Sequence, residues 1–228
     1  MIINQFEDIE NLKNQFEQKQ KLQINNFMEQ IFAEKLFQYI YLEKNWSLST
    51  GIDKMKYEKK IIPQYEKANA LQIKNVNSSF GNDKFTYIFN RAMNNNLNMS
   101  YFEFTLRQTL NSKEFIDKLN EITGLELSRL TTLFLSKYKP GNFLSPHSDK
   151  GNGRLAFVIY LTKFWKPQYG GILHFMSENR KDIIESFVPT FNSFVIFNVP
   201  KDEGIPHFIS HVVPNVKYSR FAITGWFD

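Results

Sequence analysis

The chain contains no cysteine among its 228 residues. This excludes a disulfide framework and any zinc site built on thiolates. No stretch approaches the roughly 20 consecutive apolar residues that span a bilayer as a helix. The N-terminus, Met-Ile-Ile-Asn-Gln-Phe-Glu-Asp, lacks the basic start and apolar core of a signal peptide. We therefore expect a cytoplasmic protein with no membrane partner.

Histidine is also scarce, with 4 in the chain, whereas aromatic residues are abundant, with 23 Phe and 10 Tyr. The net charge is +5, but the lysines are interspersed with Glu and Asp. Such mixing is typical of a solvated surface and argues against nucleic acid as the partner. A hydrophobic content of 42% supports a full core, and the length fits one large domain covering residues 1–228.

The first part of the chain, residues 1–125, combines helical and β patterns. Phe6, Ile9, Leu12 and Phe16 recur at helical spacing. Residues 52–82 are polar, and we expect a partly mobile insertion there, with a short helix near 64–70. The other elements predicted are helices over 5–20, 28–42 and 112–122, strands over 22–27, 45–51 and 85–91, and an extended or loop segment over 100–105.

The second part, residues 126–228, has the pattern of short strands separated by Gly, Pro and Asn turns. Several short strands at this spacing indicate a β-sandwich or barrel. No linker divides the chain. The predicted strands are 130–138, 154–164, 171–176, 183–187, 193–198, 211–213 and 220–227.

His147-Ser148-Asp149 is the motif with the clearest chemistry. Residues i and i+2 on extended backbone point to one face, so an imidazole and a carboxylate can reach one metal ion together. A third ligand must come from downstream, where the candidates are His207 and His211. Two histidines and one carboxylate form the facial triad of non-heme Fe(II) oxygenases. The alternative is that His147 and Asp149 form a surface pair ahead of a strand.

Spacing favours His211 over His207 as the third ligand. A short strand from His211, a turn at Pro214-Asn215 and a second strand would bring Arg220 back beside it. His207 follows Pro206 and would lie at the mouth of the site. On a strand, His174 and Leu173 would face opposite ways.

The second part of the chain resembles the 2-oxoglutarate- and Fe(II)-dependent oxygenases, in particular the prolyl 4-hydroxylase branch. The resemblance implies a mainly β double-stranded β-helix, or jelly roll, with the N-terminal helices packed on one sheet and residues 1–125 as helical and β support. It also implies that the insertion over 52–82 folds over bound peptide as a lid, and the alternative is a solvated insertion with no role. Since the match places Leu173 inward, His174 would point away from the site. The matching motifs are Tyr138-Lys-Pro-Gly-Asn, His147-X-Asp149, Gly151-Asn-Gly-Arg, Ile159-Tyr-Leu, Gly170-Gly171-Ile-Leu, His211-X-Val213 and Arg220-X-Ala-Ile-Thr-X-Trp226.

The resemblance also assigns roles to individual residues. His147, Asp149 and His211 would hold Fe(II), and 2-oxoglutarate and O2 would be cosubstrates, with ascorbate as an additional candidate cofactor. Arg220 would grip the distal carboxylate of 2-oxoglutarate with its planar guanidinium. The remaining predicted cosubstrate-site residues are Tyr160 on the same carboxylate, Tyr138 near the metal, Thr224 as a hydrogen-bond donor, Trp226 at the metal end, and Val158, Leu173 and Val213 as an apolar wall.

The predicted function is hydroxylation of a prolyl residue in a protein or peptide, with release of succinate and CO2. Hydroxylation of a free amino acid or another small molecule is the alternative enzyme activity. Nucleic-acid dealkylation is disfavoured, because Trp226 stands where that branch carries a second arginine. A jelly-roll binding module without activity is the alternative from another class of protein.

Overall fold

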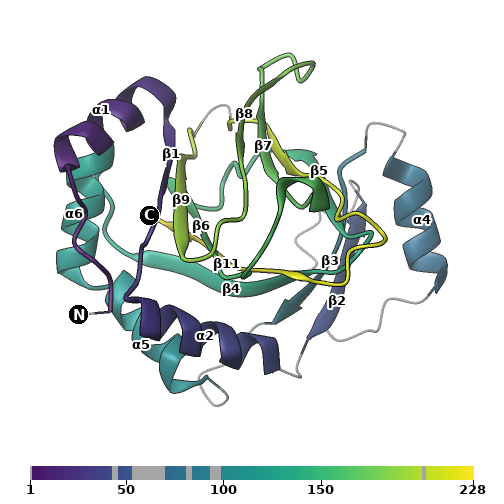
Figure 1. Cartoon of the computed structure of the whole chain (residues 1–228). Helices are drawn as coiled ribbons and strands as arrows, with labels where there is room; N and C mark the ends of the chain where they lie inside the picture. Colours follow the sequence, from purple (N-terminus) through teal and green to yellow (C-terminus); the bar gives the residue numbers. More distant parts are fainter. Residues whose placement is uncertain (1, 43–45, 53–69, 81–83, 93–98, 202–203) are drawn as a thin grey trace.

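The computed structural model describes the chain except for residues 1, 43–45, 53–69, 81–83, 93–98 and 202–203 (Figure 1). The helices are α1 (Ile9–Lys19), α2 (Gln30–Leu42), α4 (Ala70–Phe80), α5 (Tyr101–Leu110) and α6 (Lys113–Thr123). The strands are β1 (Lys21–Ile24), β2 (Ser47–Ile52), β3 (Thr86–Ala92), β4 (Leu130–Tyr138), β5 (Phe143–His147), β6 (Leu155–Tyr160), β7 (Leu173–Met176), β8 (Ile183–Phe187), β9 (Ser193–Asn198), β10 (His207–Ile209) and β11 (Arg220–Phe227).

The strands form one antiparallel sheet that curls nearly into a barrel, and the predicted jelly roll is confirmed. The hydrogen-bonded order is β1-β9-β6-β11-β4-β3-β5-β10-β7-β8, and β2 pairs with β3. β3 joins the two halves of the barrel, because its C-terminal end pairs with β4 and its N-terminal end pairs with β5. Figure 1 shows β4 and β11 as the long strands across the middle, with β7 and β8 on the opposite side.

Four helices cover the outer face of the long strands, as the resemblance implied. In Figure 1, α1, α6, α5 and α2 lie along that side of the sheet. Alternate residues of the strands, such as Leu135, Ile159 and Ile223, are fully buried between sheet and helices. The residues between them point into the barrel, where Tyr138, Tyr160 and Ala222 belong to a second buried cluster. The helices therefore hold the sheet from outside, and the inner face is free to form a site.

Two predicted elements need correction. Residues 100–105 were expected to be extended or loop, but α5 begins at Tyr101. Ser100 caps it by accepting a hydrogen bond from the backbone N–H of Glu103, and Leu106 and Leu110 are buried in the core. The strand predicted over 211–213 is instead β10, four residues earlier in the chain. Among the described helices, none combines the length and apolar character needed to cross a membrane.

The predicted insertion at 52–82 is described only in part. Residues 53–69 and 81–83 lie outside the described residues, so the lid and all but the last residue of the helix predicted near 64–70 stay untested predictions. The remainder includes α4, which lies beside β2 and β3 (Figure 1). Val76 of α4 is buried against Ile88 and Phe143. This stretch of the insertion is therefore part of the packed scaffold.

Candidate active site

His147, Asp149 and His207 come together inside the barrel. His147 ends β5, Asp149 follows it in the next loop, and His207 begins β10, where it pairs directly with His147. One ligand atom from each residue lies within 4.8 Å of the others. His147 Nε2 is 3.5 Å from Asp149 Oδ1, and His207 Nε2 is 3.6 Å from Asp149 Oδ2. The predicted pair is thus completed by a third donor.

That third donor corrects the prediction for His211. The ring of His211 lies outside the barrel, 4.2 Å from the ring of Phe143 and 4.8 Å from that of Phe80. His211 lies outside the barrel because β10 ends at Ile209, before His211. The backbone of Gly170 packs against the backbone of His211. A Cβ on Gly170 would lie 2.0 Å from the His211 carbonyl oxygen, so the backbones meet closely and the ring faces outward.

A β-bulge turns His147 toward the interior. β5 has one residue more between Leu144 and His147 than β10 has between its paired residues, His207 and Ile209. Phe143 faces the α4 side and Leu144 packs against the barrel core, so strict alternation would have placed His147 outside. The extra residue shifts this alternation by one. The bulge contains Pro146, which has no N–H to lose from the ladder.

Backbone carbonyls fix both histidines in the same orientation. His147 Nδ1 is 3.0 Å from the carbonyl oxygen of Ser145, and His207 Nδ1 is 2.8 Å from that of Ile205. Nδ1–H donates in each case, and the neutral tautomer then carries its lone pair on Nε2. Both Nε2 atoms face Asp149. Such second bonds typically hold a metal-binding imidazole in position.

Asp149 is held as a carboxylate. Burial alone would raise its pKa, but the positive charge that His207 carries when it is protonated, the contacts of His147 and a hydrogen bond from Trp226 lower the pKa to about 2. The Trp226 indole Nε1–H donates to Asp149 Oδ2 over 3.2 Å. Trp226 therefore lies at the metal end of the site, where it was expected.

The donor set fits Fe(II). Two imidazole nitrogens and one carboxylate oxygen on one side of an ion leave its other positions for small-molecule ligands. Within the described parts of the chain, this is the group of His, Asp and Glu side chains that satisfies the geometry of a metal site.

Arg220 is buried in the barrel, and no acidic side chain among the described residues forms an ion pair with it. Its side chain is 1% exposed, and its Nε and Nη2 have no hydrogen-bond partner within the described chain. The Tyr160 hydroxyl is likewise unpaired and buried. The guanidinium carbon lies 4.8 Å from the ring centre of Tyr138 and 5.0 Å from that of Tyr160. Burial of an unpaired cation is unfavourable unless an anion binds to it. A carboxylate fits the planar guanidinium, because it can accept two parallel hydrogen bonds from it.

The two tyrosines beside Arg220 remain neutral. Burial raises the pKa of Tyr138 and of Tyr160, and the nearby charge of Arg220 offsets only part of that increase. A neutral phenol keeps its O–H as a donor. The Tyr160 hydroxyl can therefore share a carboxylate with Arg220.

Strand pairing places the remaining predicted residues. Thr224 lies opposite Val158 on the inner face, two residues from Trp226. Val158 and Leu173 are buried in the inner cluster, and their role as an apolar wall of the cosubstrate site stays a prediction. Val213 is 40% exposed, so its predicted place in the wall is wrong, and the buried residue there is Val212. His174 bonds Ser186 outside the histidine cluster, as predicted.

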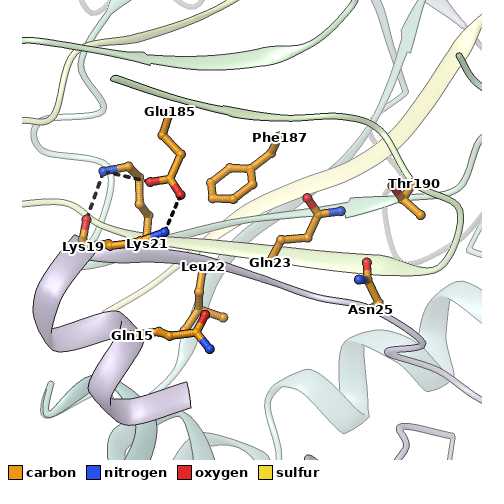
Figure 2. A pocket seen from close by; sticks show the side chains of 9 residues that line it. All are labelled: Gln15, Lys19, Lys21, Leu22, Gln23, Asn25, Glu185, Phe187 and Thr190. Atoms are coloured by element: carbon orange, nitrogen blue, oxygen red, sulfur yellow. Dashed lines mark hydrogen bonds and ion pairs between the residues drawn. The ribbon is translucent and has the colours of Figure 1, made fainter. Parts of the chain in front are cut away.

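A second hollow of about 300 Å³ lies between α1, β1 and β8 (Figure 2). Both lysines that line it share one carboxylate, since Glu185 lies 3.1 Å from Lys19 Nζ and 3.5 Å from Lys21 Nζ. It offers no unpaired charge comparable to Arg220. The lining residues are Gln15, Lys19, Lys21, Leu22, Gln23, Asn25, Glu185, Phe187 and Thr190.

Comparison with known sequences finds two kinds of similarity. The family model described as the 2OG-Fe(II) oxygenase superfamily matches residues 133–228, which include all three clustered ligands and Arg220. The chain is also 30% identical over 120 residues to prolyl 3-hydroxylase OGFOD1 of Mus musculus. That match covers 50% of this chain but 22% of the relative, so the chain spans less than a quarter of its length.

Solved structures share the fold over nearly the whole chain. A prolyl-4-hydroxylase from Pseudomonas putida superposes with a TM-score of 0.60 at 13% identity, covering 96% of this chain and 97% of the other. A prolyl hydroxylase from Trichoplax adhaerens, in complex with a hypoxia inducible factor peptide fragment, gives 0.54 at 15% identity, covering 96% and 88%.

Proposed function

We propose that this chain, whose residues 133–228 belong to the 2OG-Fe(II) oxygenase superfamily, hydroxylates a prolyl residue of a protein or peptide. The reaction would convert 2-oxoglutarate and O2 into succinate and CO2 while one oxygen atom enters the substrate. The observation that carries the proposal is the pairing of two features in one barrel. The ligand cluster and the buried Arg220, which has two nitrogens without a hydrogen-bond partner among the described residues, both lie in the barrel interior.

The residues divide the work by their chemistry. His147, Asp149 and His207 would hold Fe(II), which supplies the oxidising chemistry when bound. Arg220 would bind the distal carboxylate of 2-oxoglutarate through its unpaired nitrogens, and the Tyr160 hydroxyl would donate a further hydrogen bond to it. Trp226 keeps the Asp149 carboxylate in place. The apolar side chains of Val158 and Leu173 exclude water around the cosubstrate.

A prolyl substrate is supported by the names of the relatives. The sequence relative is a prolyl 3-hydroxylase, and the two structural neighbours are a prolyl-4-hydroxylase and a prolyl hydroxylase with a bound peptide. These names share the prolyl residue but differ in the carbon that is hydroxylated. Amino-acid analysis of the product should therefore distinguish 3-hydroxyproline from 4-hydroxyproline.

Succinate formation tests the activity directly. Purified protein with Fe(II) and 2-oxoglutarate should form succinate slowly without substrate, and Asp149→Ala should abolish this formation while the protein remains folded. A cell lysate treated with the protein should then contain peptides heavier by one oxygen atom at proline. Hydroxylation of a free amino acid instead of peptides would support the small-molecule alternative, and absence of any succinate would leave the jelly-roll binding module.

A further inference from the structure

Arg91 is a second cation on the inner face of the barrel, and the proposed reaction does not use it. It lies on β3 opposite Ser136 of β4, and the neighbouring inner-face residue Phe89 stacks on Tyr138 with ring centres 5.0 Å apart. No ion pair links Arg91 to an acid among the residues described, and its buried Nε has no hydrogen-bond partner. Burial lowers the pKa of Arg91, but an arginine starts so high that it keeps its charge.

Contacts connect Arg91 to the metal end of the site. Its guanidinium carbon lies 3.7 Å from the ring centre of Phe134, in cation–π geometry. The ring of Phe134 lies 6.0 Å from that of Trp226, whose indole N–H bonds Asp149. This stacking holds the guanidinium plane in one orientation beside the site, and its Nε has no hydrogen-bond partner among the described residues.

The charges of the loaded site balance without Arg91. The double charge of Fe(II) and the charge of Arg220 offset Asp149 and the two carboxylates of 2-oxoglutarate. Among the residues that the structure describes, Arg91 then remains as a partly buried positive charge with no counter-ion. Leaving such a charge unpaired is costly, and an anion that arrives with the substrate would remove the cost.

We propose that Arg91 is a specificity-determining residue that pairs with an acidic side chain of the peptide substrate, close in sequence to the hydroxylated proline. This inference rests on the proposed function. The planar fork of Arg91 would accept a carboxylate in two parallel hydrogen bonds, with Phe134 as the platform beneath it. Peptides with Glu or Asp at one position near the proline would therefore be preferred over peptides with Gln or Lys there.

A peptide library decides the question. Peptides centred on proline carry Glu, Gln or Lys at each flanking position in turn, and two quantities are measured. The first is hydroxylation with Fe(II). The second is binding by fluorescence anisotropy, with Mn(II) in place of iron and 2-oxoglutarate present. At one position the protein should prefer Glu over Gln by roughly tenfold, both in hydroxylation and in binding. That ratio corresponds to the free energy of one charge-assisted hydrogen bond.

Three variants separate recognition from folding. Arg91→Gln should remove the Glu preference while substrate-free succinate formation and the KM for 2-oxoglutarate stay unchanged. Arg91→Lys keeps the charge but loses the planar guanidinium, so the ratio of Glu to Gln use should become smaller. This variant replaces Arg91→Gln in the test if Arg91→Gln does not fold. Arg129→Gln, which removes an exposed arginine far from the barrel interior, should keep the full preference.

Each other outcome overturns a defined part of the account. Equal use of Glu and Gln by the unmodified protein, or an undiminished preference in Arg91→Gln, would show that Arg91 does not recognise an acid. Succinate formation with no peptide bound or hydroxylated would refute the peptide substrate, and with it the role of Arg91. Absence of succinate formation would refute the proposed activity alone, and the anisotropy measurement would still decide on Arg91.

Discussion

Replacing Arg220 tests whether the buried cation is the anchor for 2-oxoglutarate. In Arg220→Lys the charge remains, but the two unpaired nitrogens, Nε and Nη2, are replaced by a single ammonium. One charge-assisted hydrogen bond is lost, which is worth about 1.5–3 kcal/mol. The Kd for 2-oxoglutarate should therefore rise by roughly tenfold to 150-fold.

Thermal unfolding with Mn(II) makes this change measurable without turnover. At a concentration of 2-oxoglutarate that is a hundred times its Kd, the unmodified protein gains about 2.7 kcal/mol of stability. A tenfold weaker Kd reduces that gain to about 1.4 kcal/mol, and a hundredfold weaker Kd reduces it to about 0.4 kcal/mol. Arg129→Lys, an exchange at an exposed position, should keep the full gain.

Arg220→Met sharpens the test, because it removes a charge that has no counter-ion in the described structure. The protein without cosubstrate should unfold at the same temperature or higher, since a buried unpaired charge is costly. The shift caused by 2-oxoglutarate should disappear. If Arg220→Lys and Arg220→Met both bind 2-oxoglutarate as the unmodified protein does, Arg220 is not the anchor and the cosubstrate lies elsewhere.

Two further substitutions probe the surroundings of the site. Trp226→Phe removes the hydrogen bond to Asp149 and should weaken Mn(II) binding by about 10–100-fold in calorimetric titration. Trp46→Phe, on the outer side of the sheet, should leave the Mn(II) affinity unchanged. An equal Mn(II) affinity in the two variants would contradict the role of Trp226. Gly171→Ala places a Cβ at φ +63°, so the free energy of unfolding should fall by about 1–2 kcal/mol. The new Cβ would lie 3.0 Å from Arg220 Cδ, so the KM for 2-oxoglutarate should also rise. Gly124→Ala, at φ +67° with open space, should show the loss of stability without the change in KM.

The strands of the inner face could be predicted because they alternate regularly. On β11, Arg220 and Trp226 have the same parity, and both point into the barrel with Ala222 between them. His-X-Asp was also visible as a motif, although Asp149 lies in the loop after β5 and not on a strand. These features depend on local sequence, where parity and residue type suffice.

The third ligand could not be fixed in this way, because it depends on pairing between distant strands. The choice of His211 assumed that it begins the strand leading back to Arg220, whereas β10 starts at His207 and pairs with His147. A local signal for His207 did exist: His207 and Ile209 share one face of a short strand, and Phe208 between them lies on the other face. The bulge in β5 has a local sign in Pro146, but the pairing with β10 decides its register and therefore the face to which His147 points.

The central claim is that His147, Asp149 and His207 form the iron site of an oxygenase, and the two candidate histidines allow a matched test. His207→Ala and His211→Ala are compared in Mn(II) binding and in Fe(II)-dependent succinate formation. His207→Ala should lose metal affinity and turnover, whereas His211→Ala should keep both, because its ring lies outside the barrel against Phe143. Full activity in His207→Ala, or its loss in a folded His211→Ala protein, would contradict the account.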